Sequence, residues 1–389
     1  MMDSKSRSTS SADATLRARV RAAIARNRGL LFASPSLVGR HTYLGRDILA
    51  PNSSLVDHGD ARGYVPVEWW ICSSVAAGNP IAKDGEGVAS FFVPFFVPPS
   101  PSDEDVGEDD TATVRLTDIL RVAERDVLGD YAHAWPLIKV LDIGGAAVAP
   151  LFSDNNNNDA AATPPREVPP IPAHVHSGYI CDGRCCGHGK LEAYFFPPLS
   201  GKHAGVTAKT RLGIKPGTPP DTLLRCMRCF GQDDSMYQHL NEFPIEPFSG
   251  WTIACGVVHA PGPYLTFEVQ LPQDDGNLLA WQLGQRIDDA EERAREKERS
   301  MLKTAGDERA LFEQIVDMSL SSDVAFRDKW FHPSKVIEAG AEWGRRMQTF
   351  FGRFYGEAIE VVAGGRYVLP AEERPCVLVV WQGAGMVNG

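Results

Sequence analysis

The sequence predicts a mainly β fold with helical additions, and its turn spacing carries this prediction. Short β-prone runs alternate with clusters of Gly, Pro, Asn and Asp over residues 38–100 and again over 171–285. Such spacing is typical of antiparallel sandwiches or barrels and disfavours a strand–helix–strand fold. Residues 345–389 return to a β pattern with glycine-rich turns, which indicates a second β unit.

Helices are expected at three places between and before these β segments. Near the N-terminus, Leu16, Val20 and Ile24 lie on one stripe surrounded by arginines, the pattern of an amphipathic helix. Residues 115–128 carry a second helical pattern of Leu, Ile and Val. Residues 285–318 begin with a run that is charged nearly all round, which predicts a solvated helix or connector.

Three other segments divide the chain further. WPLIKVLDIGG at 135–145 is expected to be a buried strand that enters a glycine turn. The acidic stretch 101–113 and the Asn- and Pro-rich stretch 153–170 lack apolar periodicity and are expected to be a loop and a linker.

The composition argues against two classes of partner. A formal net charge of -11 disfavours a nucleic-acid-binding protein, because phosphate binding requires clustered basic residues. No apolar run is long enough to cross a bilayer, so no membrane partner is expected. The N-terminus has no apolar signal core, which predicts a cytoplasmic protein with reduced thiols, while its Arg- and Ser-rich start leaves mitochondrial targeting as an alternative.

A cluster of metal-ligating residue types lies within IPAHVHSGYICDGRCCGHGKLEAYFFPP at 171–198. In a strand, side chains two positions apart point the same way, so His174 and His176 share a face, as do Lys190 and Glu192. A further imidazole follows at His259 in GWTIACGVVHAPG. Imidazole and carboxylate ligands suit Zn, Fe, Ni, Mn or Co, and we expect one divalent transition metal, with Zn first among them. Taken alone, the His-x-His pair could equally be two polar residues on an exposed strand.

The cysteines pose a separate question. Cys181 and Cys185 lie in CDGRCC, and Cys226 and Cys229 form a C-x-x-C pair. Two such groups can close a second, structural zinc site. A redox pair and unligated loop thiols are the alternatives.

These ligands resemble those of the cupin family, small jelly-roll β-barrels in which His-x-His, a Glu on the next strand and a later His bind a metal. Three pieces in order, WPLIKVLDIGG, PAHVHSG with GKLEAYFFP, and GWTIACGVVHAPGPYLTFEVQ, are similar to the type I mannose-6-phosphate isomerases. The resemblance spans roughly residues 135–285. It implies metal ligation by His176, Glu192 and His259, with His174 standing where that family has Gln.

The resemblance also implies the chemistry. Lys190 matches a lysine two residues before the Glu ligand, and Glu268 with Gln270 matches a Glu-x-Gln pair. A metal-dependent aldose–ketose isomerase of a sugar or sugar phosphate would then use Glu268 as a base and Lys190 to stabilise negative charge. The alternative is that Lys190 and Glu268 are solvated surface residues with no catalytic role. An Fe(II) cupin dioxygenase and a non-catalytic cupin that binds a small ligand are the alternative functions.

The expected organisation combines these elements. It comprises an N-terminal tail and helix (1–30), a metal-binding cupin domain with inserted loops (38–285), a helical connector (286–340) and the start of a second cupin-like β domain (341–389). The fold class that the resemblance implies is mainly β, a cupin-type jelly-roll barrel with helical additions and a second β-barrel, complete or not, at the C-terminus. The expected partner is a small-molecule substrate, and a homodimer stays open as an assembly.

Overall fold

The computed structural model describes residues 11–40, 65–77, 91–93, 114–142, 170–177, 180–181, 184–185, 189–199, 208–274, 276–301, 307–369, 375–381 and 385. The acidic stretch 101–113 and nearly all of the linker 153–170 lie outside the described residues.

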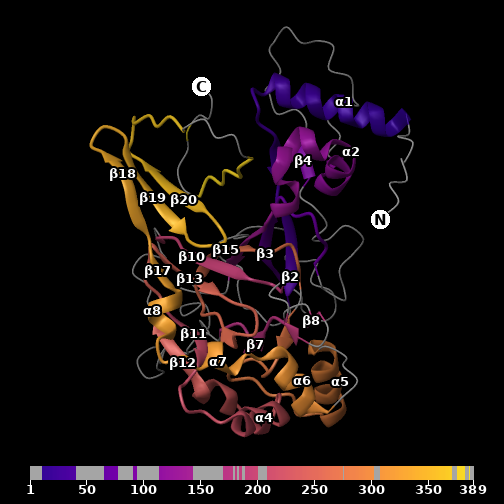
Figure 1. Ribbon diagram of the computed structural model, residues 1–389, viewed down its shortest axis with the longest axis vertical. Coiled ribbons are helices and arrows are strands. Elements are labelled where there is room, and N and C mark those ends of the chain that lie inside the picture. The colour runs from indigo at the N-terminus through magenta and orange to yellow at the C-terminus, as the bar shows by residue number, and fades with distance from the viewer. Residues whose placement is uncertain are drawn as a thin grey trace, which may run out of the picture.

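A seven-stranded antiparallel sheet crosses the middle of the molecule in the order β17-β13-β10-β15-β6-β3-β2 (Figure 1). Its strands are β2 (Ser36–Arg40), β3 (Val65–Ile71), β6 (Leu137–Asp142), β10 (Glu192–Phe196), β13 (Ser249–Ile253), β15 (Leu265–Gln270) and β17 (Phe331–Pro333). β6 falls within the strand predicted over 135–145. Its neighbours β3 and β15 come from segments far apart in the chain.

A five-stranded antiparallel sheet packs against the first, in the order β12-β11-β14-β7-β16. Its strands are β7 (His174–Val175), β11 (Lys209–Ile214), β12 (Leu240–Pro244), β14 (His259–Ala260) and β16 (Asn277–Leu278). Tyr194 and Trp251 of the larger sheet share a buried core with Leu212 of the smaller one. The prediction of a strand-rich, antiparallel fold is confirmed at this level.

Helices cover the other face of the five-stranded sheet and gather at the lower end of Figure 1. They are α4 (Pro220–Arg228), η5 (Ser235–His239), α5 (Ala290–Ser300), α6 (Glu308–Ile315) and α7 (Met318–Ser321). α8 (Phe326–Trp330) lies instead beside β13 and β17 of the larger sheet, and its Phe326 is buried with Trp251. Ala173 and Val175 of the sheet pack against Leu223 of α4 and Phe312 of α6. α5 buries no side chain, as predicted for the charged run, whereas the following α6 joins the core.

The N-terminal helix docks onto the second helix of the chain. This layer contains α1 (Ser11–Arg26), α2 (Leu116–Leu128), η3 (Gly129–Ala134) and a small sheet of β1 (Phe32–Ser34), β4 (Phe91–Val93) and β5 (Val114–Arg115). The predicted stripe on α1 packs against α2, with Val20 buried beside Ile119. Arg17 and Arg21 both pair with Asp126 of α2, at 2.8 and 2.9 Å.

The C-terminal β pattern forms a three-stranded antiparallel sheet of β18 (Lys335–Gly340), β19 (Gly344–Phe350) and β20 (Gly356–Val361). Phe350 of β19 lies 6.4 Å, ring to ring, from Phe195 of β10, so this sheet packs on the larger one. The domain boundaries and a second barrel stay predictions.

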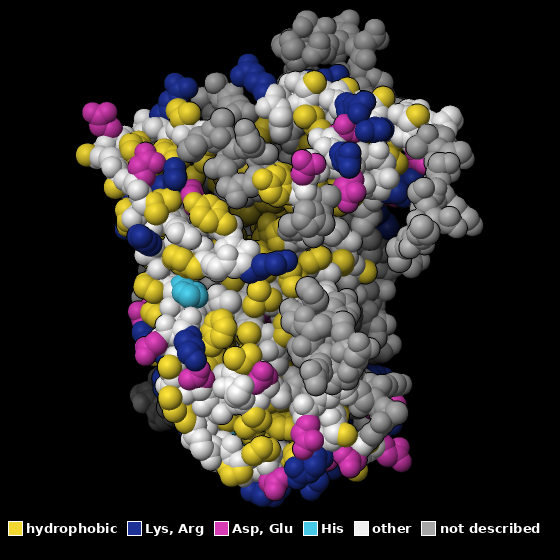
Figure 2. Space-filling view, in the orientation of Figure 1, with side chains coloured by type: hydrophobic (Ala, Val, Ile, Leu, Met, Phe, Trp, Pro, Cys, Tyr) yellow, Lys and Arg dark blue, Asp and Glu magenta, His cyan; other side chains and the backbone are white. Residues whose placement is uncertain are grey.

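The distribution of charged side chains on the surface agrees with the composition, which disfavours a nucleic-acid-binding protein. On the face shown in Figure 2, Lys and Arg are intermixed with Asp and Glu, and no single basic patch dominates that face. Among the described helices, none combines the length and apolar character needed to cross a membrane.

Candidate metal centre

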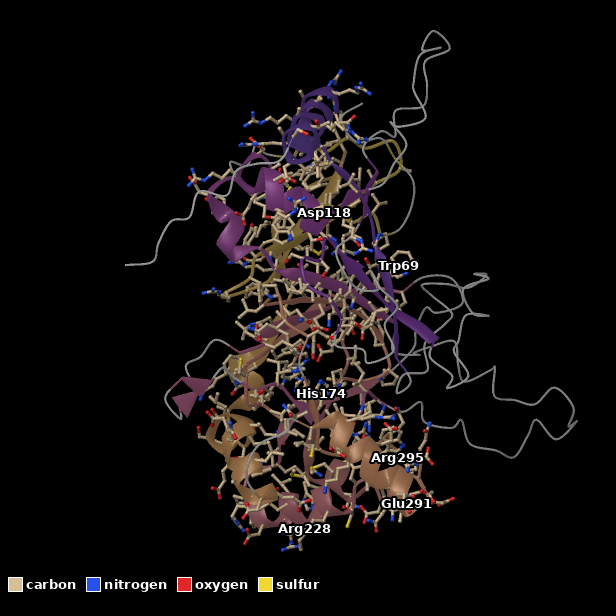
Figure 3. The ribbon with its side chains drawn as sticks, turned by 90° about the vertical axis from the view of Figure 1, so that its right-hand side faces the viewer. Trp69, Asp118, His174, Arg228, Glu291 and Arg295 are labelled. Carbon is tan, nitrogen blue, oxygen red and sulfur yellow. The ribbon has the colours of Figure 1, made fainter. Side chains whose placement is uncertain are left out.

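Three histidines from the five-stranded sheet meet between the two sheets. His174 of β7 and His259 of β14 are paired across neighbouring strands, and His176 follows β7 directly. Their ring centroids lie 4.1 to 5.1 Å apart. One nitrogen of each lies within 4.8 Å of the others, and together they form a group able to hold a metal ion. Figure 3 places His174 near the middle of the molecule, above the helix that carries Glu291 and Arg295.

Strand alternation explains why these imidazoles converge. Ala173 and Val175 point into the apolar core beneath the helices, so His174 points to the opposite face, toward the larger sheet. Around the third histidine, Val258 and Ala260 occupy the same apolar core and turn His259 inward. All three imidazoles are buried, with exposed fractions of 8%, 4% and 0% for His174, His176 and His259.

Backbone carbonyls fix the tautomers of two of the histidines. Nδ1 of His174 donates to the carbonyl oxygen of Pro172 at 2.7 Å, and Nδ1 of His259 donates to that of Val257 at 2.8 Å. A carbonyl only accepts, so each Nδ1 carries the proton. In the neutral ring, Nε2 then presents a lone pair, the form that binds a metal.

Glu192 approaches the triad from the larger sheet. Its Oε1 lies 2.9 Å from Nε2 of His259, and its Oε2 lies 3.3 Å from Nε2 of His176. Nε2 of His259 is fully buried and makes no hydrogen bond with any described residue. The lone pairs of Oε1 and of this Nε2 therefore face each other, and a cation bound by both atoms would be stabilised there. This donor set fits a divalent transition metal.

Lys190 and Glu268 adjoin the triad on the side of the larger sheet. Nζ of Lys190 lies 2.8 Å from Oε2 of Glu192 and 3.3 Å from Oε1 of Glu268. It also lies 3.1 Å from Nε2 of His176. Both Lys190 and Glu268 are buried, so the reading of either as a surface residue is wrong.

Burial and charge shift the pKa values of these groups in different directions. Burial lowers the pKa of Lys190, but the carboxylates of Glu192 and Glu268 outweigh it and raise that pKa above its usual value. Burial raises the pKa of Glu192, but Lys190 and two histidines outweigh it, and the pKa lies well below its usual value. Burial raises the pKa of Glu268 to about 7, because Lys190 offsets only part of the effect. Burial also lowers the pKa of His174 and of His176.

A second group of buried charges next to this site was missed in the sequence. Nζ of Lys139 on β6 lies 3.5 Å from Oδ1 of Asp274, 3.8 Å from Oε2 of Glu68 and 4.5 Å from the ring centre of Trp70. Lys139 is paired across the strands with Glu268, which brings this group to the same region of the sheet. The available signal was a lysine between the apolar residues Ile138 and Val140 of this strand.

The cysteine prediction stays untested. The structure gives the backbone of β8 (Ile180–Cys181) and β9 (Arg184–Cys185), which form a two-stranded hairpin, but their side chains lie outside the described residues. Cys226 is buried on α4, and Cys229 follows that helix and is partly exposed.

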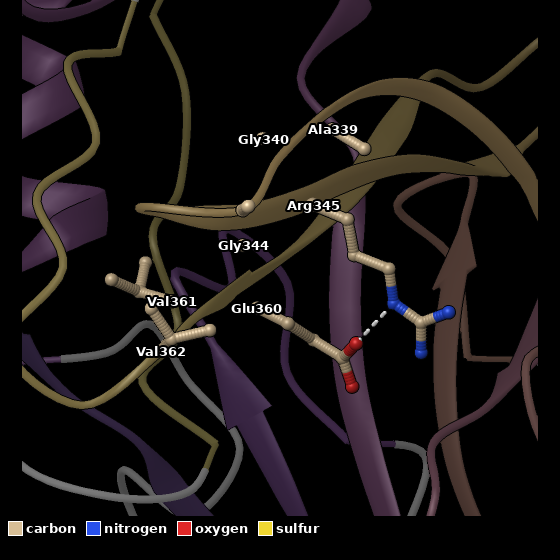
Figure 4. A pocket seen from close by; sticks show the side chains of 8 residues that line it. Ala339, Gly340, Gly344, Arg345, Glu360, Val361 and Val362 are labelled. Carbon is tan, nitrogen blue, oxygen red and sulfur yellow. Dashed lines mark hydrogen bonds and ion pairs between the residues drawn. The ribbon is translucent and has the colours of Figure 1, made fainter.

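Two pockets lie elsewhere among the described residues. A cavity of about 500 Å³ sits at the end of the C-terminal sheet, where Arg345 pairs with Glu360 (Figure 4). Another of about 320 Å³ lies beside Arg211 and Tyr237. No predicted site residue lines either of them.

Comparison with known proteins gives structural likeness only. No protein-family model matches the sequence, and no curated protein sequence matches it significantly. Among solved structures, mannose 6-phosphate isomerase from Bacillus subtilis is similar with a TM-score of 0.45 and 12% identity, over 85% of this chain and 80% of that one. A mutant of phosphomannose isomerase from Salmonella typhimurium is similar with a TM-score of 0.38 and 9% identity, over 81% and 79% of the two chains. At these values the likeness carries no functional conclusion, and the chemistry depends on the side chains of the site.

Proposed function

We propose that this protein is a metal-dependent aldose–ketose isomerase acting on a sugar or sugar phosphate. The observation that carries the proposal is the contact between a three-histidine group and a buried lysine–glutamate pair, Lys190 and Glu268. His174, His176 and His259 would hold the metal, with Glu192 at its edge. When bound, the metal would polarise the substrate carbonyl and stabilise negative charge on its oxygen.

The residues around the triad supply the proton chemistry. An aldose–ketose conversion moves a proton between adjacent carbons, and a base whose pKa lies near neutrality can both take and return it. Glu268 fits this role, because burial raises its pKa to about 7. The Lys190 ammonium can donate a hydrogen bond to a substrate oxygen as negative charge develops there.

The charge of Lys190 bears on the choice of substrate. Two carboxylates already contact its ammonium, Glu192 at 2.8 Å and Glu268 at 3.3 Å. Much of its charge is therefore compensated before any anion arrives. For this reason unphosphorylated sugars should be tested alongside sugar phosphates.

The arrangement of the sheets supports a proposal about the fold as well. The two facing antiparallel sheets, with the triad between them, support a cupin-type jelly roll over 38–285. The three strands after β17 support a second β unit in the C-terminal region.

The test combines metal analysis with an isomerase assay. The protein, purified without a metal-affinity tag, is analysed for bound metal and reconstituted in turn with Zn²⁺, Mn²⁺, Ni²⁺, Co²⁺ and Fe²⁺. Each form is then incubated with aldoses, ketoses and their phosphates, and conversion is followed by NMR. We expect one equivalent of metal at the triad and interconversion of at least one aldose–ketose pair.

Variants assign the roles. Glu268→Gln should retain the metal and lose turnover by a factor on the order of 10²–10⁴. Glu242→Gln, on the exposed edge strand β12, is the matched control and should behave as the parent protein. Metal-loaded protein that converts no sugar, or an iron form that consumes O₂ with an organic substrate, would contradict the isomerase proposal.

A further inference from the structure

Both oxygens of the Glu192 carboxylate contact neighbours on the same strand face, Oε2 through an ion pair and Oε1 through a hydrogen bond. Lys190, Glu192 and Tyr194 occupy alternate positions and point to one side. Nζ of Lys190 lies 2.8 Å from Oε2, and the hydroxyl of Tyr194 donates to Oε1. We refer to these three residues as the carboxylate clamp.

The ring of Tyr194 is fixed where it stands. It is 2% exposed and packs in the core that joins the two sheets, together with Phe196 and Trp251. Its position is also set by the strand pairing, which places it opposite Glu268 on β15 and Trp251 on β13. A ring held in this way cannot follow a carboxylate that rotates, so the carboxylate must stay where the hydroxyl can reach it.

The hydroxyl is aimed at the atom that faces the triad. Oε1 of Glu192, which accepts from Tyr194, is the same oxygen that lies 2.9 Å from Nε2 of His259. A phenol has one proton to donate, and burying it in an apolar core is unfavourable unless it is bonded. A phenylalanine would fill the same volume without that cost. The next two residues of β10, Phe195 and Phe196, are phenylalanines.

From this geometry we propose that Tyr194 is a positioning residue for the metal centre: with Lys190 it fixes the Glu192 carboxylate so that one lone pair of each oxygen remains directed at the histidines. The proposal rests on the metal site of the proposed function, but not on isomerase activity. Residues that hydrogen-bond to a metal ligand commonly change metal affinity by 10- to 100-fold when they are removed.

The test is Tyr194→Phe, which removes one oxygen and keeps the ring. Co²⁺ affinity of the metal-free protein is measured by competition with a chromophoric chelator, and the visible absorption of bound Co²⁺ reports its coordination. We expect about 10- to 100-fold weaker binding and a changed Co²⁺ spectrum, with a metal-free melting temperature close to that of the parent.

Tyr264→Phe is the matched control. Tyr264 is also buried in the same core, but its hydroxyl donates to the carbonyl oxygen of Pro197 at 2.9 Å and not to a site residue. Its loss should leave Co²⁺ affinity and spectrum unchanged. A purely structural role for Tyr194 would lower the metal-free melting temperature of Tyr194→Phe without altering its Co²⁺ spectrum.

The outcomes separate this inference from the proposed function. Co²⁺ affinity and spectrum of Tyr194→Phe that equal those of the parent would overturn the role of Tyr194 and leave the isomerase proposal intact. A parent protein that binds Co²⁺ but converts no sugar would overturn the isomerase proposal, while the affinity difference would stand. A parent protein that binds no metal would overturn both.

Discussion

Replacement of His259 by Gln should abolish metal-dependent stabilisation while leaving the metal-free protein almost as stable as the parent. In the metal-free state the variant loses the hydrogen bond from Nδ1 to the carbonyl oxygen of Val257, 2.8 Å long, which is worth about 1 kcal/mol. The new amide can donate to the nearby carboxylate of Glu192, which removes the contact between two lone pairs at 2.9 Å. We therefore expect a net change of about 1 kcal/mol or less.

The metal-bound state should differ much more. A ligand at 100 times its Kd stabilises the native state by about 2.7 kcal/mol if it does not bind the unfolded chain. The entropy of unfolding, about 2.1 cal/mol/K per residue, gives roughly 0.8 kcal/mol/K for a chain of 389 residues. Saturating metal should thus raise the melting temperature of the parent by about 3 °C, and His259→Gln should show no such rise.

The assay is a thermal melt of EDTA-treated protein with and without added Co²⁺. His332→Gln is the control, because this half-buried histidine contacts Thr252 at 3.2 Å and belongs to another part of the larger sheet. It should keep the full metal-dependent rise. If His259→Gln kept the parental rise and the parental metal stoichiometry, the assignment of His259 as a ligand would be wrong.

Three further predictions concern the scaffold. Trp251→Ala, which empties a side-chain site that is 1% exposed, should lower the free energy of unfolding by about 3–5 kcal/mol in urea titrations, whereas Tyr355→Ala at a 60% exposed site should cost far less. Gly256→Ala should lower the free energy of unfolding more than Gly217→Ala in the same titration. Both glycines have a positive φ (80° and 82°), but only at Gly256 would the new Cβ meet other atoms, at 2.9 Å. Equal losses of stability would refute the contribution of this steric contact. The pKa of Asp126 lies below its usual value because Arg21 and Arg17 donate to it, so its contribution to the docking of α1 is present above the usual carboxyl pKa of about 3.9 and is lost as the pH falls through the lowered value. Hydrogen exchange in α1 should therefore be faster in Asp126→Asn than in the parent at neutral pH, and a difference that persisted in strong acid would contradict this.

Local sequence pattern identifies the residue pairs that share a strand face, and the family resemblance adds the rest of the candidate metal centre. His174 with His176, and Lys190 with Glu192, were predicted from the period of two along a strand, which depends only on neighbouring residues. His259 was added from its glycine-turn context. The structure brings these residues together between two sheets.

Cross-strand register explains what the sequence did not reveal. Lys139 contacts Glu68, and Glu268 is opposite Tyr194, only because β6, β3, β15 and β10 are neighbours in the sheet. No local pattern specifies that order, since these strands are separated by long stretches of chain.

The carbonyl groups that hold His174 and His259 each come from the residue two positions earlier in the chain, Pro172 and Val257. The orientation of each ring is thus determined within its own short segment. Little reorganisation of these two rings should be needed when an ion binds. The rate of metal uptake should therefore be set by the loss of water ligands from the ion and by its diffusion to the buried site. Slow loading would then indicate restricted entry to the buried centre, and different divalent ions should load at rates that follow their rates of water exchange.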